Sequence, residues 1–186
     1  MRSKREKLIN KIENIKPSKQ LLDYAKNLGI EVPAEVNKTD VRALIDRELD
    51  DDDIAPLELK LYAKEKGMNF SDYVGNRYLH TLIFDHLELR DKIIFFCFCV
   101  YRFSYGKEDE NLLKHKYLDK FNSFADKYIN DSLFITSMEE YIGEDLAYFG
   151  KSQRKMNSGK VKNVYGGSIH TRAYLESKGY IDANIL

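Results

Sequence analysis

The sequence lacks a net charge, because 30 Lys and Arg residues balance 30 Asp and Glu residues over 186 positions. No global field draws the chain to DNA, RNA or an anionic membrane, so attraction to a polyanion must come from local patches. It also lacks any run of about 18 apolar residues, the length that a membrane-spanning helix needs. Its start, Met1 to Lys7, is charged and does not have the apolar core of a signal peptide. The sequence therefore predicts a cytoplasmic protein with no membrane partner.

Cysteine is scarce, with only Cys97 and Cys99 in the chain. Two positions apart on a helix, their side chains would point about 200° apart, so a disulfide between them would be strained. No further cysteine exists to complete a zinc site. We expect two buried thiols, and neither a metal nor another cofactor.

One stretch is strongly apolar, from Lys92 to Phe103, and no residue from Ile93 to Tyr101 is charged. Each large apolar side chain contributes roughly 1.5 to 3 kcal/mol when fully buried, so this stretch is expected at the centre of the core. Its periodicity does not distinguish a helix from a strand. The segments on both sides have helical spacing, and we therefore predict a buried helix over residues 89–105.

An internal repeat precedes this stretch. Residues 19–49 align with residues 57–87 at a constant offset of 38, with nine identities in 31 positions and no gap. Typical composition would give about two identities by chance. The pattern indicates one supersecondary unit used twice. In the first copy a helix ends at Gly29, an extended stretch follows, and a second helix begins near Asn37 or Thr39.

The first copy contains two segments, Pro17 to Gly29 and Asn37 to Leu49. Together they resemble the SAP family of small DNA-binding modules, which consist of a helix, an extended loop and a helix. The resemblance covers about 33 residues of the first copy and, more faintly, about 31 of the second. It implies that backbone amides and basic side chains near the helix starts contact DNA phosphates. The matching positions are Lys19, Lys26, Lys38 and Arg42. Packing or protein binding is the alternative use of such a unit.

The second copy has Asn76-Arg-Tyr-Leu-His80 where the first has Lys38-Thr-Asp-Val-Arg42. Its second helix has apolar residues on more than one face, so we expect this copy to be built into the core. The basic residues that would remain available to a ligand are Lys60, Lys64, Lys66 and Arg77. Between the copies, the segment from Asp50 to Asp53 is typical of a solvated linker, about which the first unit could move.

The tail is the second basic region, with six Lys or Arg residues and no acid from Lys151 to Arg172. Cationic and aromatic groups together suit a nucleic-acid strand. The candidate contacts are Arg154, Lys155, Lys160, Lys162, Tyr165, Ser168, His170 and Arg172. A short helix from Ile169 to Lys178 is predicted, with Ser168 as its cap and Gly179 as its stop, and a plain turn and cap is the alternative interpretation.

Three further helices are predicted. The first is basic and amphipathic over residues 2–16 and is ended by Pro17. The second covers residues 113–128, where apolar residues recur every three or four positions. The third begins at Ser132 or Ser137 and ends at Gly150.

No catalytic site is indicated by the remaining polar residues. The histidines have neither metal-ligand spacing nor an identifiable nucleophile partner, and they are His80, His86, His115 and His170. Four carboxylates share one predicted helix, but exposed helix carboxylates are common, and these are Glu139, Glu140, Glu144 and Asp145.

The sequence therefore predicts an all-α protein in four parts. These are a basic helix (1–16), a SAP-like unit with an acidic linker (17–55), the second copy with a helical bundle (56–149), and a basic glycine-containing tail with a short terminal helix (150–186). The favoured function is non-enzymatic binding of DNA, or an accessory role on DNA, through basic patches. The alternative is a protein-binding adaptor or inhibitor, of the kind that mobile elements encode.

Overall fold

The computed structural model describes residues 15–107, 110–140, 151–155, 161–165 and 169–185, and most of these residues are helical. In chain order the elements are α2 (Lys19–Asn27), α3 (Lys38–Asp50), α4 (Leu57–Glu65), α5 (Asn76–His86), α6 (Leu89–Tyr105), η1 (Leu112–Lys114), α7 (Leu118–Tyr128), α8 (Ser132–Glu139), β1 (Lys151–Lys155), β2 (Val161–Tyr165) and α9 (Ile169–Asn184). The predicted all-α class is confirmed, with one two-stranded antiparallel ladder added to it. The predicted helix over residues 2–16 lies almost entirely outside the described residues.

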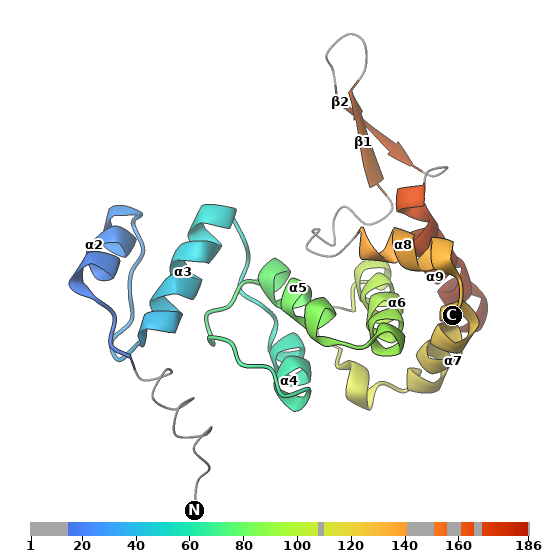
Figure 1. Cartoon of the computed structure of the whole chain (residues 1–186), viewed down its shortest axis with the longest axis horizontal. Helices are drawn as coiled ribbons and strands as arrows, with labels where there is room; N and C mark the ends of the chain where they lie inside the picture. The colour runs from blue at the N-terminus through green and yellow to red at the C-terminus, as the bar shows by residue number, and fades with distance from the viewer. Residues whose placement is uncertain (1–14, 108–109, 141–150, 156–160, 166–168, 186) are drawn as a thin grey trace, which may run out of the picture.

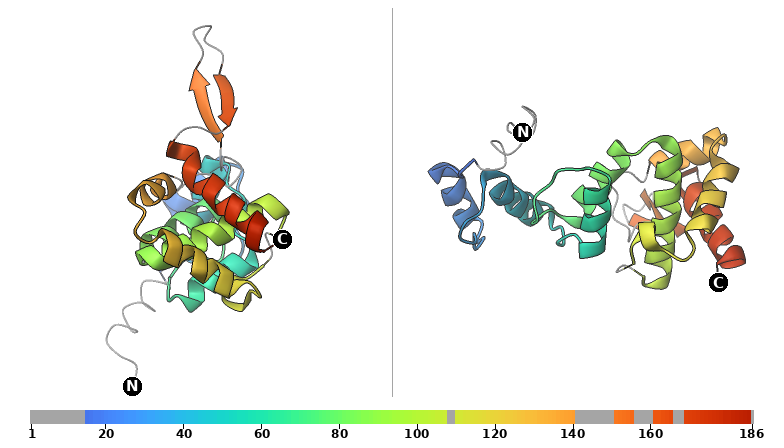
Figure 2. Two further views of the ribbon diagram at one scale, coloured as in Figure 1. Left: turned by 90° about the vertical axis from the view of Figure 1, so that its right-hand side faces the viewer. Right: turned by 90° about the horizontal axis from the view of Figure 1, so that it is seen from below.

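The helices follow one another along an elongated molecule (Figure 1). We call α2 with α3 the first pair, α4 with α5 the second pair, and α6 to α9 the bundle. The first pair extends away from the bundle, with the second pair between them, and the view from below shows the same order (Figure 2). Among the described residues, none of the helices combines the length and the apolar character that crossing a bilayer requires.

Helix α6 is the predicted central helix, and both of its predicted ends are confirmed. Every residue from Ile93 to Arg102 is buried, which explains why the sequence shows no amphipathic period there. The helix ends because Gly106 adopts a left-handed conformation (φ 62°), which glycine accepts without a steric cost. The remaining helices of the bundle pack around α6 (Figure 1).

The second pair belongs to the same core as the bundle. The Tyr62 ring of α4 stacks on Phe95 of α6, with ring centroids 5.2 Å apart and planes at 8°. Phe84 of α5 meets the same Phe95 ring edge-on at 5.2 Å. The first pair instead has a small core of its own, formed by Ala25, Val41 and Ile45.

The helix bounds of the two pairs follow the offset of 38. Helices α2 and α4 both have nine residues and start at positions 19 and 57, while α3 and α5 start at 38 and 76. Gly29 and Gly67, which follow the first helix of each pair, have nearly equal positive φ angles of 81° and 79°. That one ancestral unit was copied stays a prediction.

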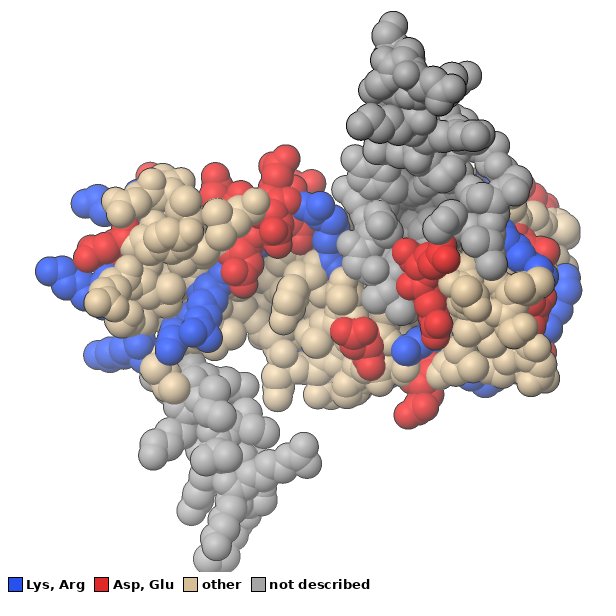
Figure 3. Space-filling view, turned by 45° about the horizontal axis from the view of Figure 1, so that its top comes forward, with Lys and Arg blue, Asp and Glu red and all other residues tan. Residues whose placement is uncertain are grey.

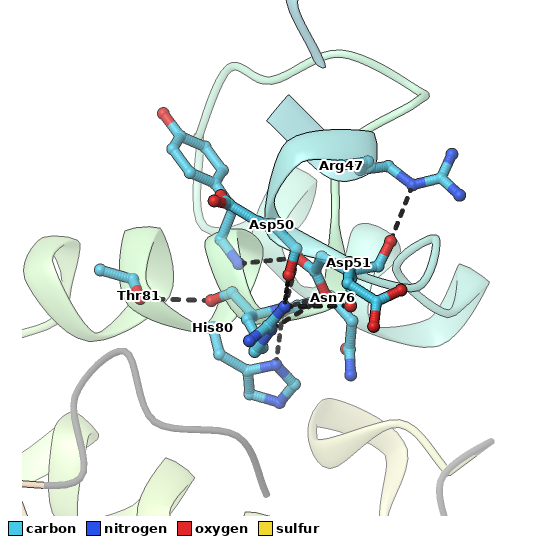
Figure 4. A network of polar contacts seen from close by, with 9 residues as sticks. Arg47, Asp50, Asp51, Asn76, His80 and Thr81 are labelled. Carbon is cyan, nitrogen blue, oxygen red and sulfur yellow. Dashed lines mark hydrogen bonds and ion pairs between the residues drawn. The ribbon is translucent and has the colours of Figure 1, made fainter. Parts of the chain in front are cut away.

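In the four-aspartate segment, Asp50, Asp51 and Asp53 are exposed as expected, but Asp52 is not. The Asp52 side chain is only 7% exposed, and its carboxylate accepts the backbone N–H of Arg77 at 3.1 and 3.2 Å, which caps the start of α5. The Arg77 guanidinium in turn donates to the carbonyls of Asp50 and Asp51 (Figure 4). Two further backbone bonds, Ala55 N to Val74 O at 3.0 Å and Asn76 N to Asp53 O at 2.8 Å, join the segment to the second pair.

The tail differs from its prediction in two ways. Residues 151–155 and 161–165 form an antiparallel ladder, which projects from the bundle half of the molecule (Figure 1). Helix α9 does not stop at Gly179 but continues to Asn184. The flanking residues Ser177 and Ile181 are buried, so tertiary packing carries the helix through the glycine, which alone costs about 1 kcal/mol relative to alanine.

Glu35 stores backbone strain in the loop of the first pair. Its φ is 63°, a left-handed conformation that costs a residue with a Cβ roughly 1–2 kcal/mol. Replacing Glu35 with glycine removes this cost but adds chain entropy to the unfolded state. We expect a net gain of up to about 1 kcal/mol in the free energy of unfolding in urea. The matched change Glu31→Gly, at an exposed residue without a positive φ, is expected to lower the free energy of unfolding. Equal effects at both sites would contradict the interpretation that Glu35 is strained.

Candidate nucleic-acid interface

Both helices of the first pair begin at the same end of that pair. The backbone N–H of Lys38, at the start of α3, donates to the carbonyl of Ile15 at 2.8 Å. Ile15 lies four residues before Lys19, where α2 begins. The extended loop between the helices therefore returns the chain to its starting end, and the two helices run in the same direction. The first amides of α3 are already bound, because Asn37 Oδ1 accepts the N–H groups of Thr39 and Asp40. The positive ends of the two helix dipoles still lie together.

Four cationic residues lie at or near these helix starts. Lys16 precedes α2, Lys19 and Lys38 are the first residues of α2 and α3, and Arg42 lies one turn into α3. We call Lys16, Lys19, Lys38 and Arg42 the basic end. Three of them are exposed and Lys38 is half-buried. Within the described part of the chain, their side chains have no hydrogen bond or ion pair.

Stability alone does not account for this placement. A cation in the first turn of a helix is repelled by the helix dipole, typically by 0.3–1 kcal/mol in order of magnitude. The nearby acid Asp40 forms no ion pair with these cations, because both of its carboxylate oxygens accept hydrogen bonds from other groups. One accepts the backbone N–H of Asn37 at 3.0 Å, and the other accepts Ser71 Oγ–H at 2.7 Å. The basic end is thus a group of unpaired cations held where an anion would be favoured.

Acidic residues gather at the opposite end of the first pair. With Arg47 they line a hollow of about 430 Å³, and they are Glu31, Glu48, Asp51, Asp52 and Asp53. Helix α3 has 13 residues, so the two ends are about 20 Å apart, well beyond the ~8 Å over which physiological salt screens charge. Figure 3 shows acidic residues gathered along the middle of this face, and basic residues with a few acidic ones over the outer part of the first pair. Charge segregation therefore gives a neutral chain a locally positive surface.

The second pair does not reproduce the basic end. At the offset of 38, its residues corresponding to Lys19, Lys38 and Arg42 are Leu57, Asn76 and the buried His80. Each of the four cations of the second pair that we expected to remain available to a ligand instead binds another group of the chain, which corrects that expectation. Lys60 and Lys64 bind the backbone carbonyl and the carboxylate of Asp72 at 2.6 and 2.9 Å, Lys66 binds Asp91 at 2.9 Å, and Arg77 binds the four-aspartate segment.

The structure brings together only part of the predicted first-unit site. Lys26 lies in the last turn of α2, at the acidic end of the pair, and is separated from the other three residues. Lys16 was assigned from sequence to the preceding basic helix and joins the basic end because of the bond between Lys38 and Ile15. Only this contact, between residues 23 positions apart, shows that Lys16 lies near the start of α3.

The tail candidates belong to a different part of the molecule, because the ladder and α9 lie on the bundle half (Figure 1). In the ladder, Arg154 is paired with Lys162, Lys155 with Val161, and Tyr165 with Lys151. Lys160 and Ser168 lie outside the described residues, and His170 is in the first turn of α9.

Arg172 is the one tail candidate whose side chain is described, and it has an internal role. Its guanidinium donates to Asp131 at 2.6 Å. Asp131 is the N-cap of α8, so this ion pair joins the start of α8 to α9. Glu176 lies 4.0 Å from the same guanidinium.

The metal-ligating groups and the thiols of the described residues were two further candidates for a site. No group of three or more His, Cys, Asp or Glu residues there is arranged to hold a metal ion. Cys97 and Cys99 are free and buried, as predicted. Burial raises the pKa of Cys99 to about 12 and that of Cys97 well above its usual range, so both thiols stay protonated and unreactive.

Comparison of the chain with models of protein families, with curated proteins and with solved structures found no match.

Proposed function

We propose that this protein binds nucleic acid, with DNA as the first candidate, through the basic end and without catalysing a reaction. One observation carries the proposal: four cations without partners among the described residues lie at the joined starts of two helices. Phosphate oxygens accept hydrogen bonds from Lys and Arg side chains and are attracted by the positive ends of helix dipoles. These contacts position a nucleic-acid backbone and carry no base preference of their own.

The size of the basic end sets the expected salt dependence. Each phosphate contact lowers the logarithm of affinity by about 0.9 per tenfold increase in salt on duplex DNA. Four contacts give a slope of about −3.6, so the affinity falls on the order of 100-fold between 50 and 200 mM salt.

The triple variant Lys19→Gln, Lys38→Gln, Arg42→Gln tests this proposal. Fluorescence anisotropy with labelled DNA is expected to show weaker binding and a salt slope about 2.7 smaller in magnitude. A matched control is Lys114→Gln, Lys116→Gln, Lys120→Gln, which removes three exposed charges from the bundle side of the molecule. An equal loss in both variants, or no binding by the unaltered protein at 50 mM salt, would refute the basic end as the site.

The tail remains a predicted second contact. Arg154 and Lys162 are neighbours across the ladder, so the double change Arg154→Gln, Lys162→Gln removes two charges from one place. We expect a further fall in the salt slope of up to about 1.8. An unchanged slope would restrict the interface to the first pair.

A protein-binding adaptor is the second candidate, and exposed apolar residues on the second pair favour it. Leu57 is 68% exposed at the start of α4, and Leu61 lies one turn further on the same face. Ile54 is exposed in the segment just before them. Apolar side chains that gather in one exposed patch often mark a protein contact. A chain with no measurable affinity for nucleic acid at low salt would leave this function as the better one.

A further inference from the structure

A cleft of about 320 Å³ lies between α3 and the second pair. One wall is the face of α3 from Thr39 to Asp50, and the other is formed by residues 69–75 and Tyr78. Both ends are fixed by hydrogen bonds across the walls. Ser71 Oγ donates to Asp40 at 2.7 Å near one end, and the Asp52 carboxylate caps α5 near the other. The cleft is therefore preformed, and its volume is at the small end of the range for ligand sites.

The lining of the cleft changes character along its length. Arg42, a member of the basic end, lines the cleft toward the start of α3. The aromatic rings of Phe70 and Tyr78 line the second-pair wall, and the Tyr78 side chain is 59% exposed. The carboxylates of Asp46 and Asp50 line the α3 wall further from the basic end, and both residues are exposed.

These groups select what can enter. Asp46 and Asp50 repel a phosphate and Arg42 attracts one, so the Arg42 end of the cleft favours a phosphate. The other cation of the lining, Arg47, donates its Nε–H to the Asp52 carbonyl at 3.3 Å. A nucleobase is uncharged, its flat face stacks on an aromatic ring, and its N–H groups can donate to carboxylates. In a duplex, by contrast, the base faces are covered by neighbouring pairs and must be unstacked before they can enter a pocket, at an energetic cost.

We infer that this cleft receives one nucleobase of a single strand whose phosphates lie on the basic end, with Tyr78 as the stacking surface. The inference rests on the proposed function and specifies it, because it makes a single strand the preferred ligand. Tyr78 belongs to the second pair, so both pairs contribute to one binding surface. No sequence pattern within the first copy alone could have indicated this.

Anisotropy titrations with a labelled mixed-sequence strand of about 15 nucleotides, and with the duplex of the same sequence, test the inference. At equal salt, the unaltered protein is expected to bind the single strand about tenfold more tightly. Tyr78→Ala is expected to weaken single-strand binding about tenfold and to leave the salt slope and the duplex affinity unchanged. Tyr78→Phe keeps the ring and is expected to retain single-strand affinity.

The matched control is Tyr24→Ala, which removes the other strongly exposed tyrosine among the described residues, 47% exposed on α2 and outside the cleft. It is expected to change neither affinity. Equal affinity for the two forms, or an equal loss in both forms for Tyr78→Ala, would overturn the inference and leave the proposed function standing. Absence of binding to either form would instead overturn the proposed function.

Discussion

Replacing Phe96 with alanine is expected to lower the free energy of unfolding by about 3–5 kcal/mol. Phe96 is fully buried in the middle of α6. Its ring meets Phe134 of α8 edge-on at 6.3 Å and Phe84 of α5 at 6.4 Å. The substitution leaves a cavity where the second pair and the bundle meet, so all three helices lose packing. Urea unfolding followed by circular dichroism measures the change.

The matched control for this experiment is Leu133→Ala on α8, where the side chain is 54% exposed. Its effect is expected to stay within about 0.5 kcal/mol. A loss below about 1 kcal/mol for Phe96→Ala would show that α6 is not the centre of the core. Since whole domains are stable by only about 5–15 kcal/mol, the expected loss for Phe96 is a large part of the total.

Gly75→Ala is expected to have the second-largest effect, a loss of about 1–3 kcal/mol. An added Cβ would lie 2.1 Å from Asp52 Oδ2 and 3.2 Å from the Arg47 Cγ atom. The Asp52 carboxylate is held by the amide of Arg77, so it cannot move without uncapping α5. Close approach, not backbone conformation, makes glycine necessary here, because the φ of Gly75 is an ordinary −73°.

Gly179→Ala provides the comparison for Gly75→Ala. Gly179 lies inside α9, and an added Cβ there meets nothing within 4 Å. This change is expected to raise the free energy of unfolding by about 0.5–1 kcal/mol, because alanine has the higher helix propensity. The two glycines should thus respond with opposite signs. A neutral result at Gly75 would mean that the four-aspartate segment does not hold the two pairs together.

The elements that depend on local chemistry were predictable from the sequence. Helix α6 was placed correctly because a long uncharged stretch must be buried and the segments on both sides have helical spacing. The start of α3 was found to within two residues because Asn37 is a strong N-cap, and it forms a capping box with Asp40. These signals act within a few positions of the chain.

Two of the errors share one cause, which is contact that the local sequence does not reveal. A run of four aspartates is normally solvated, and only the fold brings Asp52 to the start of α5, 25 positions later. Gly179 normally ends a helix, but its buried neighbours hold α9 together. The β1–β2 ladder was missed because its strands lack the alternation of apolar and polar residues that indicates a half-buried strand.

The candidate site was predictable in its residue types and less so in its arrangement. Lys19, Lys38 and Arg42 do lie together, because two helix starts coincide. Lys26 shares their charge but lies at the acidic end, and Arg172 is bound to Asp131. A sequence gives the number of cations but not which of them the fold neutralises.

The cap that Asp52 places on α5 determines where this chain can be divided for separate study. A fragment that begins at Leu57 loses the acceptor of the Arg77 amide and the Asp50 and Asp51 carbonyls that anchor its guanidinium. Such a fragment would be weakened for reasons unrelated to nucleic acid. A fragment that begins at Asp50 keeps every one of these acceptors. It is therefore the suitable fragment for measuring what the second pair and the bundle do without the basic end.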